Sequence, residues 1–112
     1  MCKGKYSTHW KEVELMKDPL DLVVVQTLLH ALKPQTIIEF GTYRGGSAHW
    51  MADLCQAYQL NGSKVFTVDI DLTLVDPRVR SNPQVHLRQG DANKPHTIFP
   101  PEELQVHPSP GA

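Results

Sequence analysis

Apolar positions follow two spacings along this chain, and the alternation between them predicts its secondary structure. Three runs have the length and the β-branched or aromatic content of strands: TIIEF at 36–40, KVFTVDI at 64–70 and QVHLRQ at 84–89. The first is bounded by proline and glycine, and each of the other two ends close to an acidic residue. We therefore expect three strands, and the first should be short and buried.

Helical spacing of apolar residues fills the stretches before and after the first strand. Residues 20–32 place leucine, valine and alanine on one face, after Asp18 and Pro19, which favour a helix start, and before Pro34, which stops the pattern. The stretch from Gly46 or Ser47 to about Gln59 repeats the spacing and is followed by an Asn-Gly stop. Two amphipathic helices are predicted. Only a short helix fits between the second and third strands.

This order of elements predicts an α/β fold with a parallel sheet and right-handed connections. We expect three parts in the 112 residues: a lid-like segment at 1–17, a partial Rossmann-like domain at 18–94 and a proline-rich irregular tail at 95–112. A doubly wound sheet would continue with more strands where the tail stands. The sheet is therefore expected to be incomplete, with its first strand left as an edge that favours self-association.

Composition narrows the class of partner. The formal net charge is -1, so no long-range field would attract nucleic acid or an anionic membrane. The two cysteines are too few for a disulfide framework, and Cys55 stands on an apolar helix face. No apolar run is long enough to span a bilayer, and the start of the chain lacks the apolar core of a signal peptide. A cytoplasmic protein with small-molecule or protein partners is expected.

The turn after the first strand carries the candidate chemistry. Gly41, Gly45 and Gly46 can bend the chain tightly at a helix N-terminus, where free N–H groups attract a ligand. Their spacing is not the dinucleotide fingerprint, and no P-loop lysine is present. Glu39 would repel a pyrophosphate but would suit an ammonium group.

Further acids follow the next two strands. Asp69 is the candidate for accepting ribose hydroxyls, with Asp71 as a less favoured substitute, and Asp91 could accept from an adenine amino group. Each acid alone could equally serve solubility. Together with the glycine turn and Glu39, they describe a site for S-adenosylmethionine.

The chain also resembles the cephalosporin hydroxylase and rhamnosyl O-methyltransferase family, a branch of the class I S-adenosylmethionine-dependent methyltransferases. The resemblance extends from about Tyr6 to Asn93 and is carried by four blocks in order. These are KYSTHWKEVELMKDPLDL, LKPQTIIEFGTYRGGSAHWMADL, VFTVDIDL with DPRV, and NPQVHLRQGDA.

The resemblance implies roles for particular residues. Asp69 would contact the ribose, Asp91 would lie near the adenine, and an N-terminal segment with Thr8, Trp10 and Lys17 would fold over the site. The cofactor turn would consist of Glu39, Gly41, Thr42, Gly45, Gly46 and Ser47.

The departures from the family pattern concern the reaction itself. A fourth strand with a metal-binding acid and histidine is missing from the corresponding region, so no catalytic residue and no metal ligand can be assigned. His96 and Asp91 have no partner that would tune them for proton transfer. Glu12 also stands where the family tends to have glycine.

Three hypotheses for function follow. The resemblance implies O-methyl transfer from S-adenosylmethionine to a small molecule, sugar or glycolipid, as in lipid biosynthesis, with Mg²⁺ in a full-length form. The alternative is a truncated, non-catalytic remnant that only binds cofactor or associates. A nicotinamide-binding Rossmann half is the third, and the absent fingerprint argues against it.

Overall fold

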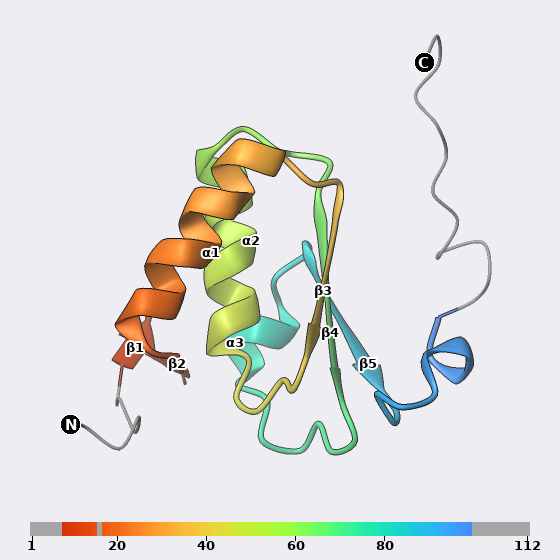
Figure 1. Ribbon diagram of the computed structural model, residues 1–112. Coiled ribbons are helices and arrows are strands. Elements are labelled where there is room, and N and C mark those ends of the chain that lie inside the picture. Colours follow the sequence, from red (N-terminus) through yellow and green to blue (C-terminus); the bar gives the residue numbers. More distant parts are fainter. Residues whose placement is uncertain (1–7, 16, 100–112) are drawn as a thin grey trace, which may run out of the picture.

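The computed structural model describes residues 8–15 and 17–99, and a parallel sheet organises this part of the chain (Figure 1). Its strands are β3 (Thr36–Phe40), β4 (Lys64–Asp69) and β5 (Val85–Gln89), in the order β3-β4-β5. Both pairings are parallel, so the three carboxyl ends meet at one edge of the sheet. The predicted α/β fold with three parallel strands is confirmed.

Helices connect the strands, as the sequence pattern indicates. The first helix starts where predicted, because the Asp18 side chain accepts a hydrogen bond from the N–H of Leu20 (2.8 Å) and Pro19 needs no partner for its nitrogen. It ends at Leu32 and is capped by Lys33, which adopts the left-handed conformation. The helices are α1 (Pro19–Leu32), α2 (Gly46–Ala57), the short α3 (Pro77–Arg80) and the 3-10 helix η1 (Pro95–Thr97).

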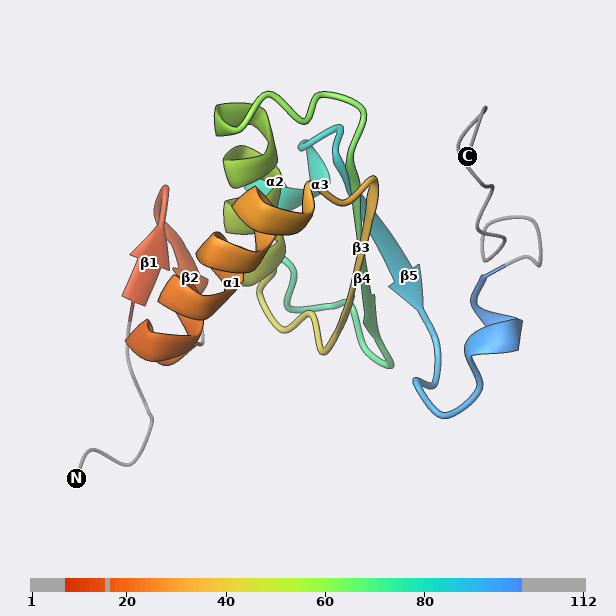
Figure 2. The same cartoon turned by 45° about the horizontal axis from the view of Figure 1, so that its top comes forward.

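An antiparallel hairpin precedes α1 and was not predicted. Its strands are β1 (Thr8–Trp10) and β2 (Val13–Leu15). The hairpin packs on α2, and Val13 and Leu15 are 0% and 3% exposed. Figures 1 and 2 show it beside the helices, on the side of the molecule opposite η1. Part of the expected lid-like segment is thus joined to the core, while residues 1–7 and 16 lie outside the described residues.

The central strand β4 is buried on both faces, which divides the core in two. Val65 faces α1, α2 and the hairpin, in a cluster that includes Val13, Leu29 and Trp50. On the other face lies a smaller cluster of Phe66, Val68, Ile98 and Phe99.

That smaller cluster corrects one expectation. Residues 95–99 were predicted to belong to an irregular tail, but η1 forms there and leaves Ile98 and Phe99 only 8% and 3% exposed. The two apolar side chains after η1, Ile98 and Phe99, cover β4. The high proline content of this region had indicated no regular structure. Residues 100–112 lie outside the part that the structure describes.

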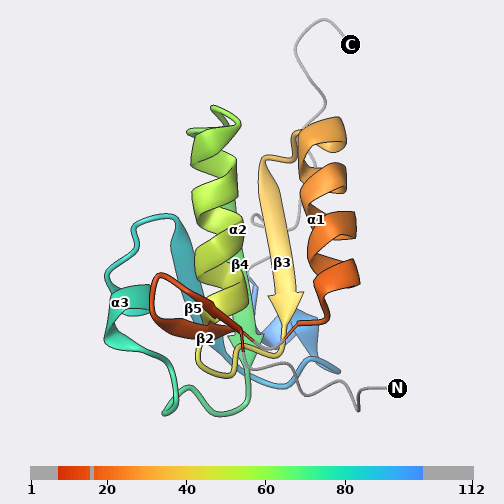
Figure 3. The ribbon, with the colours of Figure 1, turned by 90° about the vertical axis from the view of Figure 1, so that its left-hand side faces the viewer.

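Helix α1 is less buried than its amphipathic pattern predicts. It packs on α2, and Figure 3 shows it on the far side of β3 from β4, beyond the edge of the sheet. Leu29 is its buried residue, whereas several of its large apolar side chains are about half exposed or more. These are Leu20, Val23, Val24, Leu28 and Leu32.

Candidate functional site

The turn between β3 and α2 has a backbone that requires glycine. Gly41 and Gly45 have φ angles of +96° and +89°, and Tyr43 also lies in the left-handed region at +53°. A Cβ at Gly45 would come within 2.8 Å of Val79 on α3, whereas one at Gly41 would meet nothing within 4 Å. Gly45 is therefore required for packing, and Gly41 leaves open space beside the turn.

Asp69, at the end of β4, fixes this turn. Its Oδ2 accepts hydrogen bonds from the backbone N–H groups of Thr42 (3.0 Å) and Tyr43 (3.1 Å), and its Oδ1 accepts from Asp71 (3.3 Å). Burial acts to raise the pKa of Asp69, but the surrounding backbone N–H groups outweigh it and lower that pKa. The carboxylate thus stays charged and holds the loop, a role that the sequence did not indicate.

Glu39 extends from β3 under the same turn. Its Oε1 accepts a hydrogen bond from the Thr67 hydroxyl (2.8 Å), which is 2.9 Å from the Thr42 hydroxyl. Burial raises the pKa of Glu39, and Ser47, Thr67 and the positive charge of Lys17 offset part of this effect. A cationic ligand group beside Glu39 would restore the charged form.

A cavity of about 210 Å³ opens between Glu39 and the N-terminus of α2. Residues from β2, the β2–α1 linker, β3, the turn and α2 form its wall. They are Glu14, Lys17, Glu39, Phe40, Gly41, Thr42, Tyr43, Gly46 and Ser47.

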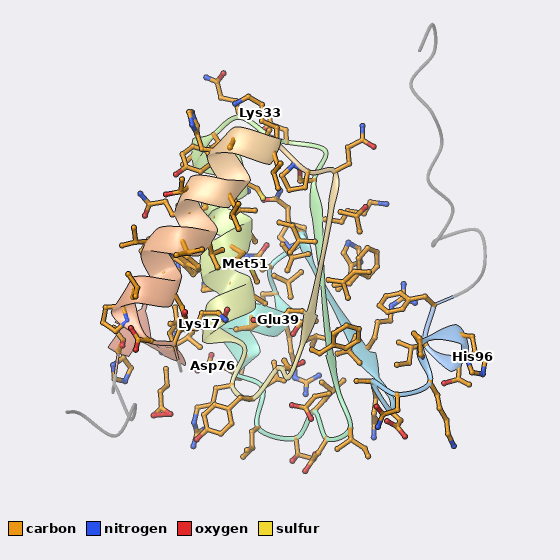
Figure 4. The ribbon with its side chains drawn as sticks, viewed as in Figure 1. Lys17, Lys33, Glu39, Met51, Asp76 and His96 are labelled. Atoms are coloured by element: carbon orange, nitrogen blue, oxygen red, sulfur yellow. The ribbon has the colours of Figure 1, made fainter. Side chains whose placement is uncertain are left out.

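Two charged residues in this wall come from outside the predicted turn. Glu14 belongs to β2, with its Oε1 3.8 Å from Nε of Arg44, and Lys17 precedes α1. They reach the cavity because the hairpin backbone lies directly on Gly46, where a Cβ would clash with the carbonyl oxygen of Glu14. Figure 4 shows Lys17 and Glu39 pointing toward one another beside the start of α2.

The hairpin is held in this position by Asp53 on α2. Oδ2 of Asp53 accepts a hydrogen bond from Nε1 of Trp10 (2.8 Å) and lies 2.9 Å from Nζ of Lys11. Burial acts to raise the pKa of Asp53, but these two partners outweigh it and lower the pKa. Trp10 therefore fastens the hairpin to α2, and of the N-terminal residues expected over the site, Lys17 is the one that lines the cavity.

Asp91 lies apart from this cavity, beyond the end of β5. Its Oδ1 accepts a hydrogen bond from the N–H of Asn93 (2.9 Å), and the preceding Gly90 donates to the carbonyl of Asp69 (3.0 Å). Neighbouring strands are about 4.8 Å apart, so β5 stands roughly 10 Å from β3. The structure thus places Asp91 at the same edge of the sheet as the turn, two strands from Glu39.

The described residues contain no group of three or more histidine, cysteine, aspartate or glutamate side chains that could hold a metal ion. In the same part of the chain, no helix is long and apolar enough to cross a membrane.

Comparison with known proteins assigns this arrangement to a family. A family model described as rhamnosyl O-methyltransferase/CmcI matches residues 2–98, which is most of the chain. The chain belongs to this family. The resemblance noted from the four sequence blocks is thereby confirmed.

Curated relatives in the rhamnosyl O-methyltransferase/CmcI family come from mycobacteria. A rhamnosyl O-methyltransferase of Mycobacterium tuberculosis is 33% identical over 88 residues, which cover 79% of this chain and 36% of that protein. One of Mycobacterium leprae is 34% identical over 74 residues, covering 66% of this chain and 32% of that protein. The chain spans about a third of the length of these relatives.

Solved structures of CmcI share the fold. A structure of CmcI with Mg and SAM superimposes with a TM-score of 0.75 at 30% identity, covering 90% of this chain and 43% of that chain. A CmcI structure with SAH has a TM-score of 0.70 at 32% identity, covering 75% and 40%. These matches show that the chain has the Rossmann-like fold of this family. The matched part covers less than half of each of these CmcI chains.

Proposed function

We propose that this chain binds S-adenosylmethionine in the cavity beside the β3–α2 turn and serves O-methyl transfer to a small molecule, sugar or glycolipid. The observation that carries the proposal is the half-buried Glu39 carboxylate, set opposite the N-terminus of α2 under a glycine turn. The relatives named rhamnosyl O-methyltransferases support a sugar hydroxyl as acceptor.

The residues of the turn fit the cofactor. The buried Ser47 Oγ lies in the cavity wall close enough to Glu39 to lower the pKa of that carboxyl, and it could turn to a polar group of a ligand instead. Helix α2 has no side-chain cap, so its first N–H groups are available, and the open space at Gly41 admits a ligand close to the backbone.

In this proposal each predicted residue contacts or shapes a part of the cofactor site. Glu39 would bind the α-ammonium group, and Gly41, Thr42, Gly45, Gly46 and Ser47 would shape the turn around the methionine end. Asp69 would accept from the ribose with lone pairs left over from its bonds to the turn, and Asp91 would lie near the adenine. When bound, the cofactor supplies an electrophilic methyl group; this chain's residues hold and orient it.

Calorimetric titration with S-adenosylhomocysteine tests this proposal. We expect the wild-type chain to bind it in preference to NAD, and Glu39→Gln to weaken binding by about tenfold, because a charge-assisted hydrogen bond is worth about 1.5–3 kcal/mol. Glu12→Gln, which removes the same charge from the hairpin turn outside the cavity, is the matched control. Equal affinity of the wild type and Glu39→Gln, or a preference for NAD, would contradict the proposal.

The alternative considered from the sequence is a non-catalytic remnant that only binds cofactor or associates. Incubation with labelled S-adenosylmethionine and rhamnosylated acceptors separates the two. Cofactor binding with methyl transfer favours the enzyme, and cofactor binding without transfer favours the remnant. A metal such as Mg²⁺ would then be sought in a longer form.

A further inference from the structure

Lys17 has a feature that the proposed function does not yet use. It lies between β2 and α1, half-buried, with its side chain in the wall of the cavity that contains Glu39. The positive charge of Lys17 lowers the pKa of Glu39. Among the described residues, however, Lys17 has no carboxylate partner within 4.0 Å. The ammonium group of Lys17 is thus placed near the cavity without being neutralised by a direct ion pair.

The size of the cavity limits which part of a ligand it can hold. At about 210 Å³ it is smaller than the roughly 300–1,000 Å³ of pockets that enclose a drug-sized ligand. Asp69 and Asp91 lie along the sheet edge outside its wall. A nucleoside would therefore extend along that edge, and the cavity would receive a group the size of an amino acid.

The charges around the cavity match such a group. Glu39 offers a carboxylate to an α-ammonium, while Lys17 and the uncapped N-terminus of α2 offer positive charge to an α-carboxylate. Glu14 also lines the cavity and is partly compensated by Arg44 at 3.8 Å. Without Lys17, two acidic side chains would face the ligand's carboxylate and repel it.

We propose that Lys17 is a specificity-determining residue that binds the α-carboxylate at the amino-acid end of the ligand while Glu39 binds the α-ammonium. This inference rests on the proposed binding of S-adenosylmethionine and adds the residue that selects ligands with a free carboxylate. Lys17 and Glu39 together then recognise a zwitterion.

The test compares ligands that differ at this one end. S-adenosylhomocysteine, its decarboxylated analogue and methylthioadenosine, which lacks the amino-acid end, are titrated calorimetrically into the wild type, Lys17→Met and Lys17→Arg. Lys64→Met is the matched control, because Lys64 is an exposed lysine where β4 begins, at the opposite end of the sheet.

We expect the wild type and Lys64→Met to prefer S-adenosylhomocysteine over the decarboxylated analogue by about tenfold or more. Lys17→Met should bind S-adenosylhomocysteine about tenfold more weakly, with its affinity for the other two ligands unchanged. Lys17→Arg should keep most of the wild-type affinity for S-adenosylhomocysteine. Equal weakening toward methylthioadenosine would show a merely structural role and overturn the inference. Retained discrimination in Lys17→Met would overturn it while leaving the proposed function intact, whereas a folded wild type that binds none of the three ligands would overturn both.

Discussion

Two carboxylates at the same end of the sheet have opposite effects on the stability of the fold. Asp69 accepts hydrogen bonds from the turn and has a lowered pKa. Its ionised form therefore stabilises the fold above the ordinary aspartate pKa, and this stabilisation is lost as the pH falls through the lowered pKa. Glu39 is half-buried, and the loss of water around its side chain favours the neutral form. Its contribution is largest at low pH and is lost as the pH rises through its raised pKa.

We therefore predict that Glu39→Gln stabilises the protein at pH 7, by about 1 kcal/mol or roughly 4 °C in thermal midpoint. The gain should be small near pH 4 and should grow as the pH rises past the ordinary glutamate pKa, because only the wild type then has to ionise a half-buried, partly desolvated side chain. Thermal unfolding of both proteins followed by circular dichroism between pH 4 and 8 measures this. A difference in midpoint that does not change with pH would contradict it.

The sequence reveals site residues that act through the local backbone and misses those that depend on tertiary packing. Glu39 and the turn from Gly41 to Gly45 could be predicted, since a strand, an acid and glycines are adjacent in the chain. Glu14 and Lys17 reach the cavity because the hairpin packs on Gly46, and no local pattern encodes that contact. The resemblance of the N-terminal block was the available signal for Lys17.

At the scale of elements, the hairpin shows why a short β structure escapes sequence analysis. Each strand has three residues, and the connecting residues, Lys11 and Glu12, have φ angles of +50° and +72°. Two-residue turns with both φ angles positive favour asparagine, aspartate and glycine, none of which is present here. Helix α1, by contrast, was predicted at its correct bounds from its cap and its prolines.

The strained turn predicts a stabilising substitution at the position where the family tends to have glycine. Glu12→Gly should stabilise the protein by about 0.5–1 kcal/mol, because the left-handed conformation costs an ordinary residue about 1–2 kcal/mol and the entropy cost of glycine offsets part of the gain. Denaturant unfolding midpoints measure the change.

Glu12→Ala is the control for that substitution. It also removes the exposed contact between Glu12 and Arg78 (3.3 Å), which is worth little in water, but it keeps the side-chain clash of the left-handed backbone. An alanine variant as stable as the glycine variant would show that backbone strain is not the cause.

At the scale of the whole molecule, β3 is an edge strand with apolar surface on either side. The order β3-β4-β5 leaves one side of β3 without a neighbouring strand in the described part of the chain. Ile38 and Phe40 on β3 are 40% and 54% exposed, and Val23 on α1 is 58% exposed. Helix α1 extends past this edge and covers one face of the region beside β3 (Figure 3). The unpaired edge of β3 itself stays open along the strand within the described residues.

The edge position of β3 could be predicted from the doubly wound order, in which the first strand lies between the second and a fourth. The expectation of a buried first strand was wrong, because Ile38 and Phe40 have no neighbouring strand on one side in the described part of the chain. Burial beyond β5 could not be predicted in the same way. Ile98 and Phe99 cover β4 only because the chain turns back after Asp91, a long-range contact in a region whose proline content suggests no structure.

We predict that two copies of the chain associate by pairing β3 with β3 in antiparallel fashion around a two-fold axis. Ile38→Lys should shift the protein toward monomer, because a charge on an edge strand opposes strand addition. Leu74→Lys, a similar change at a side chain that is 48% exposed in the linker before α3, should leave the association unchanged. Sedimentation velocity over a range of concentrations measures both. A wild type that stays monomeric throughout, or two variants that dissociate equally, would show that β3 is not the interface.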